Sequence, residues 1–184
     1  VAIAPTINGR LDDDAWKGAT VFTDFVQREP IEGNPVSERT EVRIAVDRNY
    51  LYIGAEMYDD NPAAILPGGL ERDSPGILFE EMDAFGIALD TYLDRRNSFI
   101  FFVNPAGGVK DGQGSDDGRT RDYGWDGVVI VRTRMHAQGW TMEMAIPWRT
   151  LRPSIASERL GIASSQAFLA MTESRARDAS QGVL

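Results

Sequence analysis

Side chains that commonly carry chemistry are scarce in this chain of 184 residues. There is no cysteine, a single histidine and only two lysines, Lys17 and Lys110. The absence of cysteine excludes disulfides and cysteine-ligated metals, and it does not identify the redox compartment. His136 is therefore the sole imidazole available for a catalytic triad. Because it stands beside a predicted turn, we expect a solvated surface side chain.

Long apolar runs and a basic surface are also missing. No stretch approaches the run of about 18 apolar residues that a membrane-spanning helix requires. The formal net charge is −9, and because nucleic-acid binders need basic patches, we expect no nucleic-acid partner. An acidic surface is compatible with neutral ligands, cations or solubility alone. The chain begins at Val1 rather than at Met, so we expect an excised or processed piece of a longer protein.

The pattern that dominates the chain is an alternation of apolar and polar residues. It predicts half-buried strands at 41–47, 50–57, 85–89 and 140–146. Helical periodicity is almost absent, so we predict an all-β fold, an antiparallel β-sandwich of jelly-roll type with a few short helical turns. The segments Asp47-Arg48-Asn49 and Ala137-Gln138-Gly139 are predicted hairpin connections.

Two further runs, 99–103 and 128–131, are continuously apolar, which predicts strands that are covered on both faces. Short helical turns are predicted within 11–19, where three aspartates precede Trp16 in a capping arrangement, and at 147–151, with a proline at the start.

The longest irregular segment that we expect is the Gly- and Asp-rich stretch from Ala106 to Gly124. Long loops in compact domains are usually functional or disordered, and a sandwich places them at one end, where they can form a site. We expect the sandwich domain to cover residues 1–170. Residues 171–184 are polar and lack a strand pattern, so we expect a frayed tail or the boundary of the excised piece.

Carboxylates in the Ala106–Gly124 stretch are candidate calcium ligands, because calcium takes about six to eight oxygen ligands. The candidates are Asp111, Asp116, Asp117 and Asp122. The EF-hand pattern is absent, since Asp116 stands where its glycine would be. A solvated polar loop is the alternative, and Asp59-Asp60-Asn61 is a weaker candidate of the same kind.

Aromatic rings beside polar groups indicate a possible sugar site, because the apolar face of a pyranose packs on a flat ring. Tyr123 and Trp125 are the aromatics expected in the polar loop. The polar groups that could surround them are Arg95, Arg96, Arg119 and Arg121. Trp125 could instead plug one end of the sandwich. The other tryptophans, Trp16, Trp140 and Trp148, lie in apolar patterns and are expected in the core.

Catalytic groups are not singled out by any spacing. A pair of carboxylates could support glycoside hydrolysis. The candidates are Glu80, Glu81, Asp83 and Glu143, and nothing in their arrangement marks an acid and a base. We therefore expect a protein that is not an enzyme.

Six short motifs follow one another along residues 5–152. They are PTINGRLDDDAWKGA, ERTEVRIAVDRNYLYIGAEMYDDNP, ERD, DAFGIALDTYLDRRNSFIFFVNPAGGVKD, WDGVV and GWTMEMAIPWRTLR. Their order resembles the carbohydrate-binding module family 9-like domains, in particular the bacterial subgroup in which this module precedes an outer-membrane β-barrel. The resemblance implies a β-sandwich that binds a glycan or oligosaccharide. It also implies a periplasmic or cell-surface location, where the domain does not span the membrane and is attached to the barrel.

Family 9 modules bind the ends of sugar chains between two stacked tryptophans, with calcium supporting the fold. This chain departs from that pattern, because no tryptophan lies between Gly68 and Asp90. The candidate ligand-binding residues are Trp125, Tyr123, Arg72, Arg96, Asn104 and Asp126, all but Tyr123 in positions that match the family's motifs. Some of them could be structural, with Asn104 in a turn and Arg96 paired to Asp90 or Asp94.

Three functions stay open on the sequence. The first is a non-catalytic glycan-binding module, and the second is a docking domain for the adjacent barrel with no small ligand. The third is a haem-binding electron-transfer sandwich, since related sandwiches ligate haem b through Met with His or Lys. The candidate ligands are Met57, Met82, Met135, Met142, Met144 and His136. The strand spacing of Met142 and Met144 favours core filling instead.

Overall fold

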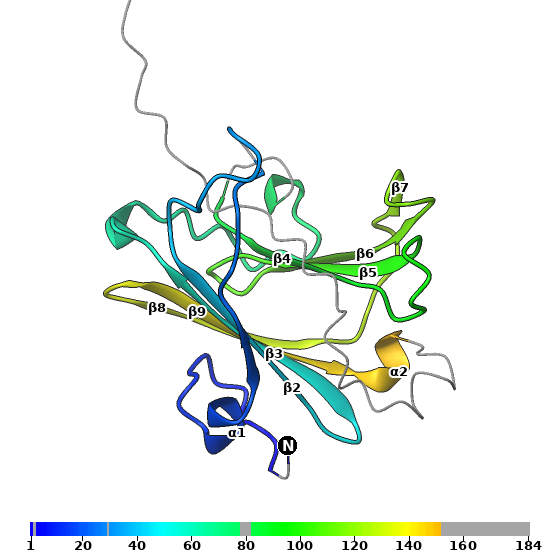
Figure 1. Cartoon of the computed structure of the whole chain (residues 1–184), viewed down its shortest axis with the longest axis horizontal. Coiled ribbons are helices and arrows are strands. Elements are labelled where there is room, and N and C mark those ends of the chain that lie inside the picture. Colours follow the sequence, from blue (N-terminus) through cyan, green and yellow to red (C-terminus); the bar gives the residue numbers. More distant parts are fainter. Residues whose placement is uncertain (2, 29, 78–81, 152–184) are drawn as a thin grey trace, which may run out of the picture.

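Two antiparallel sheets form the protein, whose computed structural model describes residues 1, 3–28, 30–77 and 82–151 (Figure 1). The five-stranded sheet has the order β1 (Thr20–Phe22), β2 (Thr40–Val46), β3 (Tyr50–Tyr58), β9 (Gly139–Pro147) and β8 (Ile130–His136). The four-stranded sheet has the order β4 (Phe85–Leu89), β5 (Ser98–Val103), β6 (Val109–Ser115) and β7 (Thr120–Asp122). The predicted all-β sandwich is confirmed.

The helical elements are short. They are α1 (Asp14–Lys17), α2 (Trp148–Leu151) and the 3₁₀ turns η1 (Pro62–Ala64) and η2 (Pro75–Ile77). Asp13 occupies the N-cap position of α1, but its side chain accepts a hydrogen bond from the backbone N–H of Thr6 instead of capping the helix. Within the described part of the chain, no helix has the length and apolarity needed to cross a membrane.

The main core lies between the two sheets and is built from the alternating positions that the sequence indicates. Ile53 on β3, Met142 and Met144 on β9 and Phe101 on β5 are each fully buried there. Burying one such side chain contributes about 1.5–3 kcal/mol, so the two inner faces supply most of the stability of the fold.

The outer face of the five-stranded sheet is also covered, by the segment that carries α1 (Figure 1). Trp16 packs over Gly54 of β3, where a Cβ atom would lie 3.2 Å from the indole ring. Glu143 of β9 is fully buried beneath this segment and accepts hydrogen bonds from the backbone N–H groups of Asn8, Gly9 and Arg10 and from Trp16 Nε1. The alternation over residues 140–146 predicts that Glu143 faces solvent. This prediction is wrong, because the N-terminal segment covers that face of β9 and buries Glu143.

Two other predictions are corrected. The Ala106–Gly124 stretch is not a long loop, because most of it forms the β6–β7 hairpin. The 128–131 run is not covered on both faces, because Val128 and Ile130 are 55% and 42% exposed where β8 forms one edge of its sheet. The predicted extension of the domain to residue 170 and the tail at 171–184 lie outside the described residues.

Candidate functional site

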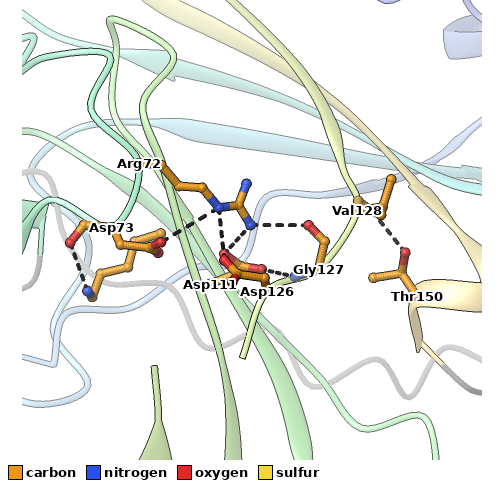
Figure 2. Close-up of polar contacts among 8 residues, drawn as sticks. Arg72, Asp73, Asp111, Asp126, Gly127, Val128 and Thr150 are labelled. Carbon is orange, nitrogen blue, oxygen red and sulfur yellow. Dashed lines mark hydrogen bonds and ion pairs between the residues drawn. The ribbon is translucent and has the colours of Figure 1, made fainter. Parts of the chain in front are cut away.

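Arg72 is the centre of a charged cluster on the inner side of β6 (Figure 2). Its Nη2 donates to Asp111 Oδ1 at 2.6 Å and to the carbonyl oxygen of Gly127 at 3.2 Å. Its Nε donates to Asp126 Oδ1 at 3.2 Å and lies 3.6 Å from Asp73 Oδ2. One guanidinium group therefore joins three chain segments that are far apart in the sequence.

Asp111 is the buried member of this cluster. It faces Phe101 across the β5–β6 pairing, is fully buried, and accepts a second hydrogen bond from the Gly127 N–H. Burial raises the pKa of Asp111, the Gly127 N–H and the Arg72 guanidinium oppose that rise, and the carboxylates of Asp73 and Asp126 add to it. The net direction of the pKa is upward, so the Gly127 N–H and Arg72 together compensate only part of the cost of burying the ionised carboxylate.

Asn104 holds the chain that leads into Arg72. It is fully buried, its Nδ2 donates to the carbonyl oxygen of Gly69, and its Oδ1 accepts from the Gly108 N–H. These bonds fasten the 69–73 segment to the β5–β6 turn, and the Asp73 N–H continues the contact by donating to the carbonyl oxygen of Val109. The structure thus gives Asn104 a positioning role behind the cluster.

Trp125 lies next to the cluster and is half-buried. Its ring packs on Phe99 and Phe101, with ring centroids 5.0 and 6.0 Å apart. A Cβ atom on Gly127 would lie only 2.6 Å from the indole and 3.0 Å from Asp111 Oδ2, so only glycine allows this approach. Trp125 therefore closes the core at this end, while part of the indole stays open to solvent.

Tyr123 does not share a surface with Trp125. It packs with Ile100 and Phe102 on the opposite, outer face of the four-stranded sheet, and Lys110 Nζ lies 4.9 Å from its ring centroid. β7 ends at Asp122, and the turn at residues 123–124 interrupts the strand between Tyr123 and Trp125. This turn separates the two aromatics that the sequence grouped together.

Arg96 and two of the predicted calcium ligands lie elsewhere. Arg96 makes exposed ion pairs with Asp117 at 3.3 Å and with Asp116 at 3.7 Å, at the β6–β7 turn. The alternative pairing of the Arg96 side chain with Asp90 or Asp94 is wrong, because those carboxylates accept hydrogen bonds from the backbone of their own loop.

Calcium was expected at Asp111, Asp116, Asp117 and Asp122, and the structure does not gather these four. Among the described residues, the group of three carboxylates whose oxygens come within 4.8 Å of one another is formed by Asp73, Asp111 and Asp126. The Arg72 guanidinium already bonds two of them, and a divalent ion would have to displace it. The donor set therefore does not fit a resident calcium ion.

Packing accounts for most of the remaining candidates, although Met135 is 42% exposed on β8. His136 is half-buried at the β8–β9 hairpin, with Nε2 3.9 Å from Glu56 Oε1, rather than freely solvated as expected. Met57, Met142 and Met144 are buried in the main core. Sequence reasoning missed the Arg72 cluster as a unit, because its members are separated by up to 55 positions and no local pattern links them.

Comparison with known families agrees with this architecture. The family model described as "Carbohydrate family 9 binding domain-like" matches residues 7–178. No curated protein matches the chain.

Solved structures show the same fold. A carbohydrate-binding module family 9 from Caldicellulosiruptor kristjanssonii, in complex with cellotriose, has a TM-score of 0.54 at 21% identity over 78% of this chain. A module of the same description and organism, in complex with glucose, has a TM-score of 0.53 at 21% identity over 78% of this chain. The chain spans about three fifths of these structures, 63% and 64% of their length. Because the family match extends over nearly all of the sequence, the chain belongs to the carbohydrate family 9 binding domain-like family.

Proposed function

We propose that this chain is a non-catalytic module that binds a neutral glycan, within an exported bacterial protein. The observation that carries the proposal is Trp125, a half-buried residue whose ring packs on the inner sheet face and which directly precedes Asp126, the partner of Arg72. Such an arrangement offers a flat apolar surface for a pyranose and hydrogen-bonding groups for its hydroxyls.

The chemistry of the cluster favours binding over catalysis. Asp111 is fully buried and is held by Arg72 and by the Gly127 N–H, so it is not available to transfer a proton to a sugar. The exposed carboxylate of Asp126 is likewise bonded by Arg72. Two solved modules of the same fold are complexes with cellotriose and glucose, and glucose-based sugars are therefore the first class to test.

The proposed setting is the periplasm or the cell surface, where the module would accompany an outer-membrane barrel. A docking domain for that barrel, without any small ligand, is the alternative, and the exposed edge of β8 offers a surface for it. Haem binding has no support in the described residues, since Met142 and Met144 fill the core and His136 lies at the far hairpin.

A thermal-unfolding panel with soluble neutral glycans tests the proposal. A ligand present at about 10 times its dissociation constant stabilises a protein by roughly 1.4 kcal/mol, which corresponds to a few degrees for a domain of this size. A rise with a particular sugar class supports the module. A flat panel, together with capture of the barrel by this domain, would replace it with the docking function.

A further inference from the structure

We propose that Tyr92, in the loop of residues 90–97, forms the sugar-contacting surface together with Trp125. This inference rests on the proposed glycan-binding function. The Tyr92 ring stacks on Phe99 with centroids 6.4 Å apart and an interplanar angle of 29°, and Trp125 packs on the same Phe99 ring. Tyr92 is 45% exposed, so a large part of its surface is open to a ligand.

The loop that carries Tyr92 is held in place by its own aspartates. The Asp90 carboxylate accepts hydrogen bonds from the N–H groups of Tyr92, Asp94 and Arg95, at 3.1, 3.3 and 2.7 Å. The Asp94 carboxylate accepts three more, from the N–H groups of Arg96 and Asn97 and from Asn97 Nδ2. The tyrosine is therefore presented in one orientation before a ligand arrives, which lowers the entropic cost of binding.

Two residues of this loop adopt left-handed backbone conformations, which the hydrogen bonds to Asp90 and Asp94 hold in place. Leu93 and Arg95 have φ values of 55° and 59°, in the left-handed region that non-glycine residues rarely adopt. Each such residue costs on the order of 1 kcal/mol or more. Leu93 is 55% exposed, so the strain is not offset by burial of its side chain.

Helix α2 ties the loop of Tyr92 to the segment of Trp125. Thr91 Oγ1 donates to the carbonyl oxygen of Leu151 at 3.1 Å, and Thr150 Oγ1 donates to the carbonyl oxygen of Val128 at 2.9 Å (Figure 2). Both bonds end in the last two residues of α2, which lies at this end of the sandwich (Figure 1). The two aromatic residues are thus held by one common support.

The charges around this surface favour a neutral sugar. Arg72 and Arg96 are both engaged by aspartates, and the chain carries a net charge of −9. A hexopyranose with equatorial hydroxyls, such as a β-linked glucose unit, presents the apolar C–H faces that stack on Tyr and Trp rings. The exposed guanidinium of Arg95, next to the loop apex, supplies donors for its hydroxyls.

Isothermal titration of the full chain with cellotriose, glucose and neutral xylo- and manno-oligosaccharides tests the inference. The variants are Tyr92→Ala and Tyr92→Phe. The control is Leu70→Ala, which removes a side chain that is 78% exposed and lies outside the proposed surface. We expect Tyr92→Ala to weaken binding by at least 10-fold. Tyr92→Phe and Leu70→Ala should stay within about 3-fold of the wild type, because stacking needs the ring and not the hydroxyl.

The outcomes separate this inference from the proposed function. If the wild type binds a sugar and Tyr92→Ala binds it equally well, the placement of the surface is wrong while the glycan-binding function stands. If the wild type binds none of these sugars, both are overturned. The melting temperature of Tyr92→Ala, measured in parallel, must stay near that of the wild type for a loss of affinity to count as loss of a contact.

Discussion

Replacement of Arg72 by alanine is expected to destabilise the protein because it leaves the buried Asp111 carboxylate without its cation. Removing one partner of a buried ion pair costs about 3–5 kcal/mol. The Arg72 side chain is 43% exposed, and solvent screens part of the interaction. The pair with Asp126, whose side chain is 73% exposed, adds little. We therefore expect a loss of about 2–3 kcal/mol, or roughly 5–10 °C in melting temperature.

The loss should depend on pH in a defined direction. The pKa of Asp111 is raised in the folded protein, and the removal of Arg72 takes away one of the two groups that oppose the rise. Burying the ionised Asp111 carboxylate lowers the stability of the folded protein. This cost is fully present above the pKa of Asp111 in the folded protein, and it disappears as the pH falls toward the pKa of the unfolded chain, near 3.8. The difference in unfolding free energy between the wild type and Arg72→Ala should therefore be largest near pH 7 and should shrink near pH 4.

Urea unfolding of both proteins at several pH values is the assay, and Arg96→Ala is the matched control. Arg96 also contacts two aspartates, but all three side chains are at least half exposed, so the control should lose no more than about 0.5 kcal/mol. Equal losses for the two variants, or a loss for Arg72→Ala that does not change with pH, would refute the reasoning.

Further predictions concern calcium, two positions in the five-stranded sheet and one in the β2–β3 turn. A chelator should leave the melting temperature of the wild type unchanged. Calcium should raise the melting temperature of Arg72→Ala, since the carboxylates of Asp73, Asp111 and Asp126 then lack a cation. A wild type whose melting temperature falls with a chelator would contradict this. Glu143→Ala should cost about 3–5 kcal/mol in urea unfolding, because four N–H donors lose their acceptor, and a cost below 1 kcal/mol would be inconsistent with the burial. Gly54→Ala should cost about 1–3 kcal/mol by overpacking against Trp16, measured in the same way. Burial raises the pKa of Asp47, yet hydrogen bonds from the backbone and from the Tyr52 hydroxyl outweigh it and the net pKa is lowered. The stability advantage over Asp47→Asn should thus be full at neutral pH, begin to fall near pH 3.8 and be lost as the pH passes through the lower folded pKa. An advantage that does not change with pH would contradict the assignment.

The strands of the main core could be predicted because their alternation reflects one buried and one open face. Residues 40–46 and 50–58 form the hairpin that the sequence indicates, and Asp47 closes it with side-chain hydrogen bonds to the following backbone. The same local logic holds for the β8–β9 turn. These strands and turns can be predicted because neighbouring residues determine them, through the turn residues and the alternation of apolar and polar side chains.

The β6–β7 hairpin was not predicted because its sequence is rich in glycine and aspartate, a composition typical of loops. Gly112 and Gly114 are there to let Tyr123 and Ser98 approach the backbone closely, since a Cβ at either position would clash with them. Asp111 points inward, which no strand pattern would predict, and its burial is compensated by the Gly127 N–H and by the ion pair with Arg72. Features that depend on a distant partner leave no local signal.

The candidate site could be predicted only in part for the same reason. Trp125 was singled out from its place in a polar stretch, and in the structure it is half-buried and packs against the main core. Tyr123 is two positions away, where a continuous strand would place it on the same face, but the turn at residues 123–124 breaks the strand and Tyr123 packs on the other face of the sheet. Tyr92 was overlooked, because its proximity to Trp125 arises through Phe99 and not through the sequence.

The measurement that tests the central claim most directly is a calorimetric titration of the full chain with the neutral glycan panel, run beside Trp125→Phe and Trp125→Ala. The account predicts saturable binding of at least one sugar, retained in part by the phenylalanine variant and lost in the alanine variant. Heat from none of the sugars, or affinity that is indifferent to Trp125, would contradict it.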